Sequence, residues 1–193
     1  MIDDYLYILS HRKDFYTKLT GCNQIIMYPK MGRSLCYNRC MDINIIAIGK
    51  LKDKSEIAIF NEYRKMLSRF ASVSVTEIPN SVYDEEEKVI HEESGKILSK
   101  IPRDSYVILC DLKGRMYSSE EFSALLSERM VKGDSRFTFI IGGSNGFDDD
   151  VRRAADMSIS FSRMTFPHKL FRIMLIEQIY RAFKIMNNEP YHK

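Results

Sequence analysis

The feature that most constrains the fold is a regular alternation of short β-rich runs with longer helical patterns from Met41 onward. Such alternation is typical of a parallel sheet with crossover helices. We expect strands at residues 43–48, 73–78, 106–111, 137–141 and 157–160, and helices at residues 55–70, 85–100, 118–131, 148–155 and 168–186. Ser118 and Glu121 have the spacing of a capping box, which places the start of the third helix. The sequence therefore predicts one α/β domain over residues 41–193.

Residues 1–40 do not share this rhythm. They hold five tyrosines among mixed apolar and polar residues, and Met41 begins what reads as a natural first strand. We therefore interpret residues 1–40 as an extension. It is either a stretch upstream of the true translation start or an arm of net positive charge that contacts RNA.

Composition excludes several classes of protein. A chain of 193 residues that is 45% hydrophobic and 28% charged is not a disordered protein. No apolar run approaches the roughly 18 residues of a membrane span, and Asp3 and Asp4 stand where a signal peptide carries basic residues. We therefore expect a cytoplasmic protein with no membrane contact.

The four cysteines predict reduced thiols, because they are too few for a disulfide scaffold in a chain of this length. Cys36 and Cys40 have the spacing of half a zinc site. No second pair completes four ligands at the usual spacing, so we expect no metal.

Basic residues gather toward the C-terminus of a nearly neutral chain. From residue 163 onward there are six basic residues and two acidic ones (Arg163, Lys169, Arg172, Arg181, Lys184 and Lys193 against Glu177 and Glu189). This distribution indicates a polyanion docked at one site rather than one wrapped by the whole surface.

A glycine-rich turn follows the fourth predicted strand, with Gly142, Gly143 and Gly146 before Asp148. Open α/β sheets bind ligands at such carboxyl ends, where glycine lets the backbone approach. The turn lacks the Lys-Ser/Thr of a phosphate loop, and the acidic residues 148–150 would cap the helix and repel phosphate. It is either a site for a ligand that is not strongly anionic or a tight turn with acidic caps.

The last helix and its flanks hold further polar residues. Arg172 falls on an apolar face, where it needs an anion, a carbonyl network or an acidic residue of the core. The helix carries apolar side chains on more than one side, as a helix that also packs against a second subunit does. Tyr191 and His192 offer a ring, a hydroxyl and an imidazole to a nucleobase, or belong to a solvated tail.

Several of these segments closely resemble the RlmH (YbeA-type) family of bacterial ribosomal RNA methyltransferases, which belong to the SPOUT class. The resemblance rests on Gly-Gly-Ser-Asn-Gly at 142–146, Ser-Phe-Ser-Arg-Met-Thr-Phe-Pro-His at 160–168, the helix from Arg172, and Pro-Tyr-His-Lys at 190–193. It covers residues 41–193, and residues 1–40 lie outside it.

The resemblance implies a SPOUT α/β-knot, which is a Rossmann-like parallel sheet whose C-terminal segment forms a deep trefoil knot. It also implies a homodimer packed through the knotted region. The implied reaction is methylation of N3 of a pseudouridine in helix 69 of 23S rRNA within the assembled 70S ribosome, with S-adenosylmethionine as the methyl donor.

The resemblance also assigns site residues. The implied donor pocket consists of Cys110, Gly142, Phe161, Ser162, Arg163, Met164, Thr165 and Phe166. The implied catalytic residues are His168, Arg172, Tyr191 and His192. We hypothesise that His192 or Tyr191 meets the target base, from the same or the other subunit, and that Arg172 holds the developing charge or the RNA backbone. Two alternatives stay open, namely a SPOUT methyltransferase for another RNA site and a non-catalytic ribosome-binding factor.

Overall fold

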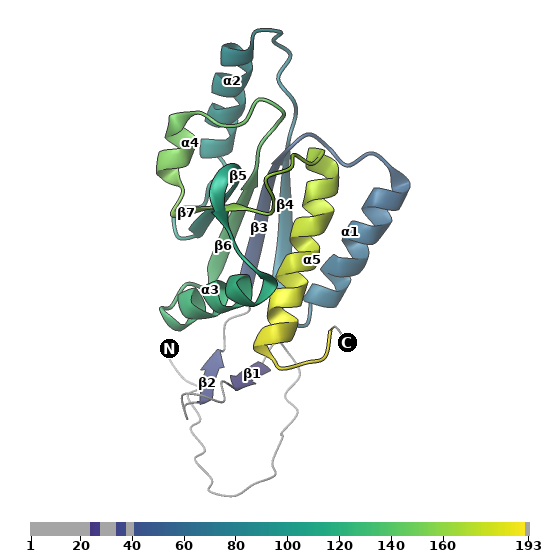
Figure 1. Ribbon diagram of the computed structural model, residues 1–193, viewed down its shortest axis with the longest axis vertical. Coiled ribbons are helices and arrows are strands. Elements are labelled where there is room, and N and C mark those ends of the chain that lie inside the picture. The colour runs from purple at the N-terminus through teal and green to yellow at the C-terminus, as the bar shows by residue number, and fades with distance from the viewer. Residues whose placement is uncertain (1–23, 28–33, 38–40, 192–193) are drawn as a thin grey trace, which may run out of the picture.

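The protein is an α/β domain built on a five-stranded parallel sheet, seen in the computed structural model, which describes residues 24–27, 34–37 and 41–191 (Figure 1). The strand order is β4-β3-β6-β5-β7. Its strands are β3 (Met41–Ile48), β4 (Ala71–Ile78), β5 (Tyr106–Met116), β6 (Arg136–Ile141) and β7 (Met157–Ser160). Before it, β1 (Gln24–Met27) and β2 (Ser34–Tyr37) form a separate antiparallel pair. The predicted parallel sheet is confirmed.

Five helices connect or follow these strands, and all five were predicted. They are α1 (Lys54–Leu67), α2 (Glu86–Leu98), α3 (Ser119–Val131), α4 (Asp149–Ala154) and α5 (His168–Met186). Residues 118 and 121 form the predicted capping box at α3, and Asp148 caps α4 by accepting the Val151 N–H at 2.9 Å. Among the described residues, no helix is both long and apolar enough to cross a membrane.

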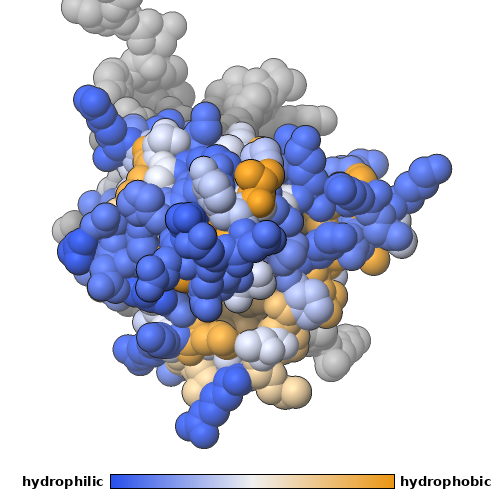
Figure 2. Space-filling view, turned by 90° about the horizontal axis from the view of Figure 1, so that it is seen from above, coloured by the Kyte–Doolittle hydropathy of each residue, from blue (hydrophilic) through white to orange (hydrophobic). Residues whose placement is uncertain are grey.

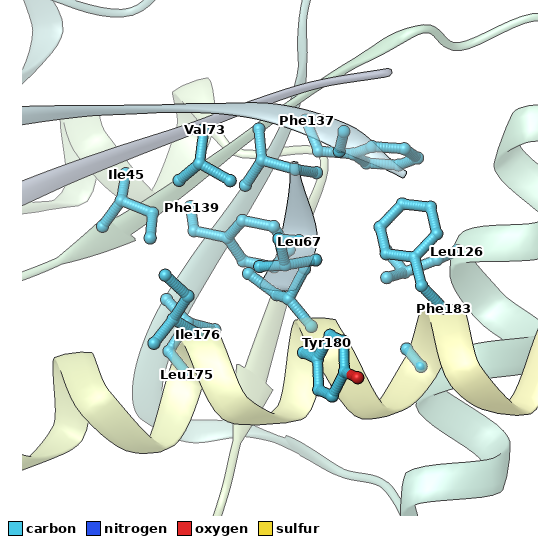
Figure 3. Packing of buried hydrophobic residues seen from close by; sticks show 14 of the residues in the cluster. Ile45, Leu67, Val73, Leu126, Phe137, Phe139, Leu175, Ile176, Tyr180 and Phe183 are labelled. Carbon is cyan, nitrogen blue, oxygen red and sulfur yellow. The ribbon is translucent and has the colours of Figure 1, made fainter. Parts of the chain in front are cut away.

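The sheet separates two hydrophobic cores. Alternate strand residues such as Ile45 and Phe139 face a core closed by α1, α3 and α5, where Leu67, Leu126 and Phe183 pack (Figure 3). The opposite strand face contacts Ile97 of α2 and Val151 of α4. Because both faces are buried, the carboxyl edge of the sheet is left as the place where a ligand can reach the strand ends.

The strand β5 is five residues longer than predicted, and its extra length lies against β7. Ile159 of β7 pairs with Cys110 and again with Arg115, with a bulge between those two partners. Gly114 comes so close to β7 that a Cβ built there would lie 2.5 Å from the carbonyl carbon of Ile159. Residues 112–116 gave no strand signal, so only the long-range pairing with β7 reveals this extension.

We expect Gly114→Ala to lower the free energy of unfolding by about 2 kcal/mol, because its methyl group would push β5 away from the backbone of β7. The matched control is Gly95→Ala in α2, where no atom lies within 4 Å of a built Cβ. That control should gain up to about 1 kcal/mol of helix propensity. Urea unfolding of both variants measures the difference, and equal stabilities would rule out the close contact between β5 and β7.

Candidate functional site

A cleft of about 530 Å³ opens at the carboxyl edge of the sheet, beside residues 110–112 of β5, where β6 and β7 end and α5 begins. Figure 2 looks onto this edge, where hydrophilic side chains cover most of the surface and hydrophobic ones show between them. Seven of the eight residues predicted for a donor pocket line the cleft: Cys110, Gly142, Phe161, Ser162, Met164, Thr165 and Phe166. The eighth, Arg163, is exposed and does not line it.

The glycine turn forms one wall of this cleft. A Cβ built on Gly142 would lie 2.7 Å from the ring of Phe147, so glycine is needed for the ring to close under the turn. Gly146 has a φ of 82°, which favours glycine. The turn therefore presents backbone, rather than side chains, to the cleft.

The loop after β7 forms the opposite wall. The hydroxyl of Ser160 donates to the carbonyl of Ser162 at 2.9 Å, and the hydroxyl of Ser162 accepts the N–H of Met164 at 3.0 Å. The ring of Phe161 packs on Phe171 of α5 with centroids 4.7 Å apart. These contacts hold the first half of the predicted loop and pack it on α5.

Cys110 lies at the floor of the cleft and is half-buried. Burial raises the pKa of its thiol, so the thiol stays protonated near neutral pH. A protonated thiol is a poor nucleophile. Cys110 therefore offers bulk and backbone groups rather than covalent chemistry.

His168 begins α5 and also lines the cleft. A Cβ built on Gly49 would lie 3.0 Å from its Nε2 atom, so the imidazole packs against the loop after β3. Burial and then the nearby Arg172 lower the pKa of His168 below its usual 6.5. The imidazole is therefore mainly neutral near pH 7 and can accept a proton.

Arg172 is 1% exposed and lies one turn into α5. Its Nη1 pairs with Oε1 of Glu77 at 2.6 Å, and its Nη2 donates to the carbonyl of Gly49 at 2.9 Å. The same Glu77 oxygen accepts the N–H of Leu51 at 3.0 Å. Of the partners considered for Arg172, the structure shows an acidic residue and a carbonyl together. This network fixes the 49–51 loop beside His168.

Tyr191 lies away from the cleft, against the second half of α5. Its ring packs edge-on against Tyr180 with centroids 5.0 Å apart, and the guanidinium of Arg181 lies 4.8 Å from its centroid. Burial, then a hydrogen bond with Tyr63, raise the pKa of the Tyr191 phenol. The predicted residue His192 lies outside the described residues. The structure therefore brings His168 to the cleft but not Tyr191 of the same chain.

A second hollow, a groove of about 550 Å³, runs along α1, α3 and α5. Tyr63 and Glu177, which contribute to the raised pKa of Tyr191, both line this groove. Ile159, Ser160 and Phe161 line both the groove and the cleft. The groove therefore links the region of Tyr191 to the back of the cleft.

Sequence reasoning missed several polar residues around the cleft. Asp111 lines it and pairs with Arg152 of α4, while Glu93 is buried and accepts the N–H of Ser81 at 3.1 Å. Asp111 ends a predicted strand, so its place at a carboxyl end could have identified it. Arg152 lies in a charged stretch that reads as a solvated helix face and gave no signal. No group of three or more potential metal ligands lies together among the described residues.

Comparison with known proteins gives strong matches for the main body of the chain. A family model described as predicted SPOUT methyltransferase matches residues 41–192. Ribosomal RNA large subunit methyltransferase H of Clostridium acetobutylicum is 48% identical over 159 residues, which cover 79% of this chain and 100% of the relative. A ribosomal RNA large subunit methyltransferase H of Clostridium kluyveri is 47% identical over the same shares.

The chain also has a fold match to a solved structure of low sequence identity. A probable methylase family protein from Haemophilus influenzae covers 78% of this chain and 70% of its own, with 13% identity and a TM-score of 0.45. The assignment therefore depends on the family model and on the relatives that are nearly half identical. The chain belongs to the SPOUT methyltransferases, in the family of ribosomal RNA large subunit methyltransferase H.

Proposed function

We propose that this protein methylates 23S rRNA of the assembled 70S ribosome at N3 of a pseudouridine in helix 69, with S-adenosylmethionine as the donor. The family and the names of its relatives support a large-subunit rRNA substrate. The observation that carries the proposal is the gathering of seven predicted donor-site residues in one cleft at the carboxyl edge. The base, its position and the ribosomal state follow from the family resemblance alone.

The cleft fits the proposed donor. Its volume lies within the range of ligand pockets, about 300–1,000 Å³, and the glycine turn leaves room for a ligand against the backbone. The acidic cap Asp148 follows the turn, which suits a cationic sulfonium better than a phosphate. When bound, S-adenosylmethionine would supply an electrophilic methyl group there, held by the turn, by Cys110 and by the 161–166 loop.

The chain's own residues provide the proton chemistry. A uracil-type N3 must lose its proton to become a good nucleophile, and the resulting negative charge must be stabilised. His168 is neutral at the cleft and can accept that proton. Arg172 stabilises the negative charge through its field and holds the 49–51 loop in place. We assign the contact with the target base to His192 or Tyr191.

We propose that the tail acts across a homodimer. Helix α5 spans about 27 Å from His168 to Met186, and Tyr191 packs beside its second half. In Figure 1 the described chain after α5 lies beside the end of that helix, opposite to its start. A second copy seated in the groove along α1 and α5 would extend toward Phe161, which the groove shares with the cleft. Its tail could then reach this cleft.

The proposal includes the trefoil knot. Ile159 of β7 pairs with both Cys110 and Arg115, so β5 and its extension contact β7 at two points. The chain then continues through the 161–167 loop into α5, which packs with α1 and α3. Passage of this C-terminal segment through a loop that includes the β5 extension is the threading that the family resemblance implies.

The test is transfer of labelled methyl from S-adenosylmethionine to 70S ribosomes isolated from cells that lack this gene. Ribosomes that also lack pseudouridine in helix 69 are the comparison. Label in 23S rRNA that depends on pseudouridine is the expected result. Label that does not depend on it would indicate another RNA site, and donor binding without any label would indicate a non-catalytic ribosome-binding factor.

A pH profile tests His168. Because its pKa is lowered, we expect kcat/KM to stay constant down to about pH 6.5 and to fall only below it, as the imidazole becomes protonated. His168→Gln should lose most of the activity, and its pH profile should no longer show the fall of kcat/KM at acid pH, which is called the acid limb. His91→Gln, at an exposed histidine of α2, is the control and should keep the wild-type profile. An acid limb retained by the His168 variant would assign the proton acceptor elsewhere.

A further inference from the structure

Two walls of the donor cleft come from the neighbouring strands β5 and β6, at the point where pairing between these strands stops. One wall is the 110–112 segment of β5, and the other is the 142–147 turn after β6. Pairing between β5 and β6 ends at Cys110 and Ile141, so beyond that pair no ladder hydrogen bond joins the two segments. Another contact must set their separation.

Arg152 of α4 bridges these two walls. Its Nε donates to Oδ2 of Asp111 at 3.0 Å, and its Nη1 donates to the carbonyl of Phe147 at 2.7 Å. The Arg152 side chain is 33% exposed and that of Asp111 is 12% exposed, so solvent screens the pair only in part. Arg152 itself does not line the cleft.

Asp111 and Phe147, the two partners of Arg152, each make a further contact within their own wall of the cleft. The other oxygen of Asp111 accepts the N–H of Lys113 at 3.2 Å, which shapes the turn in β5. At the other end, Phe147 lies under the glycine turn with its ring against Gly142. A shift of Arg152 therefore moves both surfaces that would contact the donor.

We propose that Arg152 and Asp111 form a brace that sets the width of the donor cleft, with Arg152 as a positioning residue for S-adenosylmethionine. This inference rests on the proposed function, because it assumes that the cleft holds the methyl donor. The brace pre-organises the cleft before the donor arrives, so its loss costs donor affinity. It does not touch the reacting atoms, so kcat for bound substrate is retained.

The expected effect follows from the two hydrogen bonds. A hydrogen bond to a charged group contributes about 1.5–3 kcal/mol, and partial exposure reduces this, so we expect Arg152→Met to raise the KM for S-adenosylmethionine about tenfold. Arg152→Lys retains the charge but not the two-pronged geometry, so it should recover part of the loss. Arg153→Met is the matched control, because Arg153 is exposed and pairs only with Asp150 among the described residues.

The experiment measures steady-state kinetics on ribosomes and, by calorimetry, binding of S-adenosylmethionine alone. A double-mutant cycle adds Asp111→Asn, and thermal unfolding shows that each variant is folded. We expect Arg152→Met and Asp111→Asn to weaken donor binding by similar factors and their combination to be no worse than either. These results would support the brace.

Two results would overturn it. One is an Arg152→Met variant that binds the donor as tightly as Arg153→Met. The other is a double variant whose losses multiply, since independent residues behave in that way. A wild-type protein that binds no S-adenosylmethionine would instead contradict the proposed function, so the two failures can be told apart.

Discussion

Replacing Arg172 with methionine is expected to lower the free energy of unfolding by about 3 kcal/mol, because breaking a buried ion pair leaves an uncompensated charge. The side chain of Arg172 is 1% exposed, and that of Glu77 is 31% exposed. Water can partly solvate the remaining carboxylate, so the loss should lie at the lower end of the range for buried pairs. The carbonyl of Gly49 also loses its donor.

Urea unfolding measures this loss, with Lys132→Met as the control for removing an exposed partner of an ion pair. Lys132 pairs with Glu128 one turn away on α3, where both side chains are more than half exposed. Such pairs contribute less than about 1 kcal/mol. If both variants had equal stability, the network of Glu77, Arg172 and Gly49 would not hold the fold together.

Arg172→Lys shows whether Arg172 acts only through the stability of the fold or also through the rate of the reaction. Lysine keeps the positive charge but cannot donate in two directions from a planar group. It should therefore recover only part of the stability that methionine loses. If activity fell in proportion to stability in both variants, Arg172 would serve the fold alone. A further loss of kcat in the folded methionine variant is expected, since Arg172 also holds the 49–51 loop beside His168.

The centre of the sheet could be predicted from the sequence because its central strands are buried on both faces. Ile43–Ile48 and Phe137–Ile141 read as apolar runs between helical patterns, and both are central strands. Local chemistry also placed the start of α3, where Ser118 and Glu121 cap each other. An apolar run and a capping pair each lie within a short stretch of the chain, so both can be recognised from the sequence.

The long-range polar contacts could not be predicted in this way. Arg172 and Glu77 are 95 positions apart, and Arg152 and Asp111 are 41 apart. An apolar helix face shows that Arg172 needs a partner but not which acidic residue provides it. The β5 extension beside Gly114 has the same cause, since pairing with β7 rather than local preference makes those residues a strand.

Three such contacts share a location, the carboxyl edge of the sheet. Glu77 with Arg172 holds the loop after β3, Glu93 holds the N–H of Ser81 after β4, and Arg152 joins Asp111 of β5 to the turn after β6. Beyond the paired parts of the strands, charged side chains from β4 and from the helices hold these segments. The proposed site thus depends on residues that do not contact any substrate.

Removal of residues 191–193 is expected to reduce methyl transfer at least about 100-fold, which is the scale of a lost group that acts on the base. Donor affinity should change less than about twofold, because Tyr191, the last described residue, does not line the donor cleft. Transfer assays and calorimetry with S-adenosylmethionine measure the two quantities. A truncated protein as active as the full chain would remove Tyr191 and His192 from the mechanism.

Mixed dimers test the proposed homodimer, because they show whether the tail acts on the cleft of its own subunit or on that of the partner. One subunit lacks residues 191–193, and the other carries Thr165→Arg, an exposed cleft position where a long side chain blocks the donor without disturbing the core. Each homodimer should be inactive. If the tail acts across the dimer, a mixed dimer has one intact cleft served by the other subunit's intact tail, so activity returns. If the tail acts within its own chain, no cleft in the mixture is complete. Because Tyr191 packs beside Tyr180, far along α5 from His168, we expect activity to return.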